Sequence, residues 1–196
     1  MEQCYMLMLM KKKPNMTNDN VHLSLTRATR TIYFFIALYM LSIVIFDSGN
    51  LITRESIIDR WTLVTVLLVV NTFVWFGASQ KWPFLTIKIP VALLTLTLIV
   101  FAGFMTYWER GMASTSTILY ALPILVIAIA KNRHALMATT ILAAGTYAFA
   151  SVRYFNDYFN EGYRVQLWGT IVLVGGLIVT VAWLTMIITG LRRDSK

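Results

Sequence analysis

The sequence predicts an all-α integral membrane protein with six transmembrane helices, and two features of the chain lead to this prediction. The first is a series of six stretches without Asp, Glu, Lys or Arg, which hold 16, 20, 20, 20, 19 and 27 residues and are separated by charges. A helix needs about 20 apolar residues to cross the hydrocarbon core of a bilayer. The second is composition, because 58% of the residues are apolar and 13% are charged, whereas about a quarter are charged in a soluble domain.

The six helices follow from these stretches and from the turn residues between them. A turn signal at residues 47–50 ends the first helix, Pro90 is expected in the first turn of the third, and Asn132–Arg133 forms a tight turn between the fourth and the fifth. The charged segment before Arg60 is compatible with a short amphipathic helix on the outer surface. The expected helices cover about residues 26–46, 61–78, 89–108, 115–130, 135–152 and 165–191.

Residues 1–25 are expected to form a flexible or interfacial segment on the cytoplasmic side, ahead of the bundle of residues 26–196. The segment begins apolar and rich in Met, and Lys11–Lys13 follow, which reverses the order of a signal peptide. Two interpretations stay open. The segment is either a short helix on the inner leaflet, or it is a disordered tail or a misassigned start with Met16 as the true initiator.

The charges between the helices predict the orientation of the chain. If the N-terminus is cytoplasmic, the inner side carries 12 basic and three acidic residues, and the outer side carries five basic and six acidic residues. An excess of Lys and Arg belongs on the cytoplasmic side. Both termini are therefore expected in the cytoplasm, and the net charge of +8 indicates contact with anionic lipid headgroups rather than with nucleic acid.

The expected helix interiors contain no Asp, Glu, Lys, Arg or His. Ionisable residues inside the membrane usually mark proton relays and ion pathways, so this pattern argues against a proton-coupled pump, a retinal protein and a haem-ligating bundle. The single Cys4 excludes a disulfide within the chain and a site built from several cysteines. No arrangement of Ser, His and Asp occurs at one membrane depth, so neither an enzyme nor a cofactor or metal site is expected.

A small group of helix residues is a candidate for lining a ligand pocket or a pore. Asn71 lies at the centre of the second helix, where an amide needs a hydrogen-bond partner. It is either a polar link between helices or part of a pocket. Pro123 frees the carbonyl of Leu119 and is expected to kink the fourth helix, either as a packing feature or as a hinge. Tyr120 and Tyr147 complete this group.

The external loop at residues 153–164 combines aromatic, acidic and basic side chains. Asp157 and Glu161 are four residues apart and would share one face of a helix. The loop is the best candidate for ligand contact, and the alternative is an interfacial cap anchored by tyrosine rings. Its candidate residues are Arg153, Tyr154, Asp157, Tyr158, Glu161 and Arg164.

Small residues recur in the last two expected helices and let helices approach closely. They indicate either packing within the chain or the face of a homodimer. The residues are Ala138, Ala143, Ala144, Gly145, Ala148 and Ala150 in the fifth helix, and Gly169, Gly175 and Gly176 in the sixth.

Three consecutive segments between about residues 108 and 150 form a recurrent pattern: GMAS at 111–114, LYALPIL at 119–125 and KNRHAL at 131–136. The pattern resembles the multi-helix membrane input regions of bacterial histidine kinases and diguanylate cyclases. This resemblance implies a bacterial inner membrane and a role in signal transduction. The chain carries no output domain, so signalling would need a separate partner, unless this chain is a domain excised from a longer protein.

Three functions are consistent with these features. The first is a non-enzymatic membrane sensor or accessory module, which binds a small or hydrophobic ligand or a membrane partner and relays this through the helix at 165–191. The second is a small channel or facilitator, with selectivity from threonines, Asn71 and freed carbonyls. The third is an assembly subunit of a larger membrane complex. The sequence favours the first.

Overall fold

The computed structural model describes residues 16–49, 53–82, 84–158 and 164–190, and this part of the chain consists of helices and turns without a strand. Five of its helices are long and apolar enough to cross a membrane. They are α2 (Met16–Ser48), α3 (Arg54–Ser79), α4 (Phe84–Trp108), α6 (Arg133–Tyr158) and α7 (Arg164–Ile188).

The remaining apolar segment forms a shorter helix at Thr115–Ala128. It begins as the 3-10 helix η2 (Thr115–Tyr120) and continues as α5 (Ala121–Ala128), after the single turn η1 (Gly111–Ala113). The prediction of an all-helical protein with apolar helices of membrane-spanning length is therefore confirmed. The fourth expected span, at about residues 115–130, corresponds to this shorter, composite helix.

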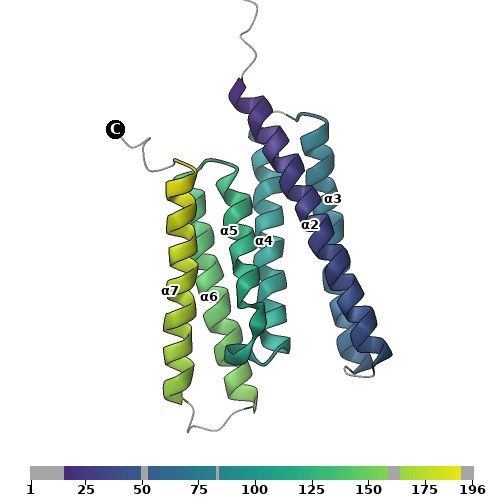
Figure 1. The fold of residues 1–196 in the computed structure, drawn as a ribbon, viewed down its shortest axis with the longest axis vertical. Helices are drawn as coiled ribbons and strands as arrows, with labels where there is room; N and C mark the ends of the chain where they lie inside the picture. Colours follow the sequence, from purple (N-terminus) through teal and green to yellow (C-terminus); the bar gives the residue numbers. More distant parts are fainter. Residues whose placement is uncertain (1–15, 50–52, 83, 159–163, 191–196) are drawn as a thin grey trace, which may run out of the picture.

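The helices run in alternating directions, side by side (Figure 1). Helix α4 is central, because it packs against α3, α5 and α6, while α7 packs against α5 and α6. The extensive contacts of α2 are with α3. The start of α2, the α3–α4 turn, the α5–α6 turn and the end of α7 lie at the upper end in Figure 1, and the other turns lie at the lower end.

Apolar side chains both fill the core and cover the outside of the bundle. Leu67, Leu94 and Ile124 are fully buried, whereas Val165 and Ile188 of α7 are 86% and 82% exposed. Exposure of so many large apolar side chains disfavours a water-facing surface. It suits a surface in contact with lipid, which agrees with the length of the helices.

The two ends of the bundle differ in charge. The charged residues of the described chain at the upper end are basic apart from Asp19: Arg27, Arg30, Lys81, Lys88, Lys131 and Arg133. The lower end mixes both signs, with Asp47, Arg54, Glu55, Asp59, Arg60, Glu109, Arg110, Arg153, Asp157 and Arg164.

Several helices extend beyond the bounds expected from hydrophobicity. Helix α2 begins at Met16, about ten residues earlier than expected, and residues 1–15 lie outside the described part. Residues 54–60 are the first turns of α3 rather than a separate surface helix, because Thr53 caps α3 by accepting a hydrogen bond from the Ser56 amide at 3.4 Å. A change from apolar to polar residues marks the edge of a membrane, and a helix can continue past that edge.

Both prolines in the helices have an unexpected position. Pro90 lies inside α4 rather than in its first turn, because α4 already begins at Phe84. Pro123 is buried in the first turn of α5, directly after the 3-10 segment. The kink expected within a continuous helix is thus replaced by a change of helix type. Proline is tolerated in the first turn of a helix, where its missing amide hydrogen would have no partner.

Candidate functional site: a groove between α4 and α6

A groove of about 370 Å³ runs between α4 and α6 in their lower halves. Its walls are mostly apolar. Its lining consists of Val100, Gly103, Phe104 and Tyr107 from α4, and Thr146, Phe149, Ala150 and Arg153 from α6. Ligand pockets commonly measure about 300–1,000 Å³ and combine apolar walls with a few polar groups. The groove has this character.

Gly103 allows the close approach of α4 and α6 at the floor of the groove. A Cβ atom added to Gly103 would lie 2.6 Å from Cγ2 of Thr146, which is too short for a real contact. The same position is 4.0 Å from the hydroxyl of Tyr120. The floor is therefore thin, and the Tyr120 hydroxyl lies directly behind it.

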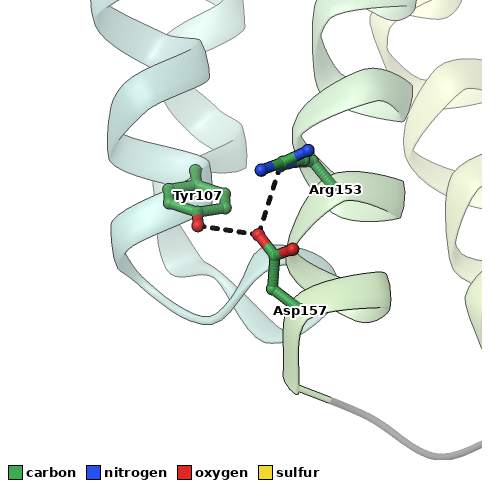
Figure 2. Close-up of polar contacts among 3 residues, drawn as sticks. All are labelled: Tyr107, Arg153 and Asp157. Atoms are coloured by element: carbon green, nitrogen blue, oxygen red, sulfur yellow. Dashed lines mark hydrogen bonds and ion pairs between the residues drawn. The ribbon is translucent and has the colours of Figure 1, made fainter.

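A polar cluster lies at the lower end of the groove (Figure 2). The Tyr107 hydroxyl donates a hydrogen bond to Oδ2 of Asp157 at 2.9 Å, and Nε of Arg153 contacts the same oxygen at 3.2 Å. Tyr107 and Arg153 both line the groove. The side chain of Arg153 is 65% exposed and that of Asp157 is 30% exposed, so the cluster is accessible from outside the bundle.

Aromatic rings extend this cluster along α6. The ring of Tyr154 lies 6.0 Å from Tyr107 and 4.8 Å from Tyr158, measured between centroids. Tyr154 also supports the turn after α4, because Gly111 has a φ of +59° and packs against the Tyr154 side chain. Residues that were expected in a loop thus belong to the last turns of α6.

The structure brings together only part of the residue set expected at 153–164. Arg153, Tyr154, Asp157 and Tyr158 share the end of α6. Arg164 begins α7 and does not line the groove, and Glu161 lies outside the described residues.

Behind the groove, Tyr120 and Tyr147 form a buried pair. Both side chains are fully buried, and their rings meet edge to face at 5.8 Å. Oγ1 of Thr106 donates to the Tyr120 hydroxyl at 3.3 Å. Within the described residues, the Tyr147 hydroxyl and Oγ of Ser151 have no hydrogen-bond partner. The two hydroxyls lie one helical turn apart on α6 and interact with each other, which offsets part of the cost of burying them.

Asn71 lies far from this groove in the fold, within the pair formed by α2 and α3. Its side chain is fully buried, and Nδ2 donates to the carbonyl oxygen of Thr29 at 3.1 Å. The Tyr33 hydroxyl donates to Oγ1 of Thr72 at 2.8 Å and joins the same two helices. Asn71 is thus placed as a link between helices.

Arg60 is a buried charge that the sequence interpretation missed, since it was counted only as a residue of the outer boundary. It is 7% exposed, and its guanidinium carbon lies 5.8 Å from the centre of the Trp108 ring. Nε of Arg60 has no hydrogen-bond partner among the described residues. The sequence signal for this pair was a basic residue at the start of one helix and a tryptophan at the end of the next helix.

Glu109 organises the turn between α4 and η2. Its Oε2 accepts hydrogen bonds from the hydroxyls of Ser114 at 3.3 Å, of Thr115 at 3.4 Å, and of Ser116. Because three hydroxyls occupy this carboxylate, Glu109 is structural at the end of the bundle. The described residues contain no group of three or more His, Cys, Asp or Glu side chains that could hold a metal ion.

The glycines of the last two expected helices, which were expected to allow close packing, face open space. A Cβ added to Gly145, Gly169, Gly175 or Gly176 would meet nothing within 4 Å. Close packing within the chain is therefore wrong as an explanation for these four glycines. The homodimer face remains a prediction.

A comparison of the chain with protein-family models, with curated proteins and with solved structures found no match. The function has to be argued from the groove and its polar cluster.

Proposed function

We propose that this chain is a non-enzymatic sensor or accessory module of a plasma membrane, with both termini in the cytoplasm. The length of the apolar helices and their apolar outer surface support insertion. The basic upper end supports the orientation, because Lys and Arg accumulate on the cytoplasmic side. A bacterial inner membrane follows from the resemblance of residues 108–150 to bacterial input regions.

The ligand of this module is an amphipathic molecule that enters the α4–α6 groove from the outer leaflet. The groove opens at the outside of the bundle, so a hydrocarbon chain reaches it without crossing water. The observation that carries the proposal is the joint position of Tyr107 and Arg153, which line the groove and share Asp157. An apolar channel with a polar cluster at one end matches an apolar tail with a polar head.

The polar cluster favours a head group that accepts hydrogen bonds. Arg153 uses Nε toward Asp157, and its remaining N–H donors suit a carboxylate or a phosphate ester. The Tyr107 ring continues the apolar wall up to this point.

The relay would run from the groove through α6 to α7. One wall of the groove belongs to α6, which packs along α7. A ligand that widens the groove would tilt α6 and displace α7 with it. A ligand can shift such an equilibrium only by as much as its affinities for the two states differ, so the groove must change width on binding.

The test begins with native mass spectrometry of the full chain in mild detergent, with identification of the molecules that copurify. A bound amphiphile is expected in the wild type and is expected to be lost from Arg153→Gln. Arg54→Gln is the matched control, because Arg54 is an exposed arginine at the same end of the bundle, outside the groove. A ligand-free symmetric oligomer would contradict the proposal and favour a channel, and equal loss from both variants would contradict the assigned site.

A further inference from the structure

A second pocket lies at the upper end of the bundle, opposite to the groove. It has a volume of about 310 Å³ and lies between the start of α2 and the ends of α5 and α7. Ser24 comes from α2, Leu125 and Ala128 from α5, and Thr185 and Ile188 from α7. The extensive contacts of α2 are with α3, so the pocket marks a seam between α2 and the rest of the bundle.

The interior of this pocket is apolar although hydroxyl residues line it. Oγ1 of Thr185 donates to the carbonyl of Val181 at 2.7 Å, and Oγ1 of Thr189 donates to the carbonyl of Thr185 at 2.7 Å. Threonines in spanning helices often bond their own backbone in this way. Because both threonine hydroxyls are already used, the pocket suits a hydrocarbon chain better than a polar solute.

The rim of the pocket is basic. Lys131 lines it and is exposed, at the turn that follows α5. Its φ of +50° and the hydrogen bond from its amide to the carbonyl of Ala128 at 3.0 Å hold this turn in place. Leu125 lies six residues before Lys131, which is roughly 9 Å along a helix. The pocket thus spans the depth from a headgroup to the first part of an acyl chain.

We propose that this pocket binds an anionic phospholipid of the cytoplasmic leaflet, with an acyl chain between α2, α5 and α7 and the phosphate at Lys131. Two independent observations agree on this occupant. The pocket is apolar inside, and the charged residues of the described upper end are basic apart from Asp19. A lipid in this position would fill the seam and hold α2 against α5 and α7. The proposal rests on the orientation proposed above but not on a ligand in the α4–α6 groove.

The test uses the full chain in vesicles of dioleoylphosphatidylcholine with a trace of phosphatidylglycerol that carries a photoreactive diazirine on its acyl chain. After illumination, peptides that cover residues 125–131 and 185–189 are expected to carry several-fold more label from this lipid than from the matching phosphatidylcholine probe. Lys131→Gln is expected to lower this labelling about fivefold, as one interfacial basic charge would. Arg133→Gln, two residues away and outside the pocket, is expected to retain it. Equal labelling by both probes, or equal loss in both variants, would overturn the proposal.

A second pair of variants tests the volume of the pocket instead of its charge. Ser24→Phe is expected to abolish the labelling, whereas Leu23→Phe, on the neighbouring position outside the pocket, is expected to preserve it. Retained labelling in folded Ser24→Phe protein would overturn the proposal, and if this variant fails to fold, the Lys131 pair decides. Arg153→Gln is expected to leave this labelling unchanged, which separates the pocket from the groove at the other end.

Discussion

The side-chain amide of Asn71 in α3 donates a hydrogen bond to the backbone carbonyl of Thr29 in α2 at 3.1 Å. Oδ1 of Asn71 has no partner among the described residues, so this single bond is the polar contribution of the side chain. Within a membrane, bonds of this kind join helices, because water is not available as an alternative partner.

Replacing Asn71 by Leu is therefore expected to weaken the pairing of α2 and α3 by about 0.6–2 kcal/mol and to leave ligand binding in the groove intact. Thermal unfolding in detergent and native mass spectrometry measure the two effects. Thr72→Val is the control, because it removes the exposed hydrogen bond between Tyr33 and Thr72 at the neighbouring position instead of the buried one. Unchanged stability together with lost ligand binding would show that Asn71 belongs to a functional site.

The spacing of charges predicted the helices well, because each apolar stretch must match the thickness of a bilayer. Helix ends were predicted less well. The cap at Thr53 starts α3 before the hydrophobic stretch begins, and α6 continues to Tyr158 after its hydrophobic stretch has ended. The polar residues around position 157 were predicted as candidates, but their meeting with Tyr107 depends on how α4 and α6 are aligned. The spacing of residues within one helix does not predict how two helices are aligned with each other.

The contact of Gly103 with α6 also depends on the alignment of two helices, and it supports a second prediction. Gly103→Ala would place a Cβ 2.6 Å from Cγ2 of Thr146 and is expected to destabilise the bundle by about 1–3 kcal/mol, as overpacking does. Thr146→Ala removes the opposing methyl group, so the double variant is expected to recover most of the loss in thermal unfolding. Gly175→Ala is the control, since a Cβ there meets nothing within 4 Å and alanine favours the helix. An additive loss in the double variant would contradict a direct contact between positions 103 and 146.

The turn after α4 allows the cost of a contact to be separated from the cost of backbone strain. Gly111 has a φ of +59°, and a Cβ there would lie 2.8 Å from Cβ of Tyr154. Gly190 has a φ of +73° with nothing within 4 Å. Both alanine variants incur the left-handed penalty of about 1–2 kcal/mol, but only Gly111→Ala also displaces α6. Gly111→Ala is therefore expected to lower the unfolding temperature further than Gly190→Ala. An equal decrease of the unfolding temperature in both variants would show that the Tyr154 side chain moves aside at no cost in stability.

Arg60 and Trp108 form a further pair that can be tested quantitatively. Their separation of 5.8 Å, in a site where Arg60 is 7% exposed, predicts a cation–π coupling of about 1 kcal/mol. A double-variant cycle with Arg60→Met and Trp108→Leu, measured by reversible unfolding in detergent, gives this coupling directly. The same cycle with the exposed Arg54 in place of Arg60 is expected to give none. Additive effects in the first cycle would show that the Trp108 ring does not stabilise Arg60.

The charge of Asp157 should determine which head groups the groove accepts. Asp157 occupies Arg153 with a carboxylate, so an anionic ligand must compete with it for the guanidinium. Asp157→Asn keeps an oxygen acceptor for the Tyr107 hydroxyl but removes the competing charge. Binding of oleate is then expected to strengthen about two- to fivefold, and binding of a long-chain amine is expected to weaken by a similar factor, as for a partly exposed ion pair.

Displacement of a fluorescent fatty acid from the purified protein measures both affinities, and the differences are expected to shrink at high salt because this site is exposed. Asp59→Asn, an exposed carboxylate at the same end of the bundle and outside the groove, is the matched control and is expected to change neither affinity. If oleate binds less tightly to Asp157→Asn than to the wild type, Asp157 positions Arg153 for the ligand instead of competing with it. The head group would then be recognised by the intact Tyr107–Asp157–Arg153 cluster as a unit.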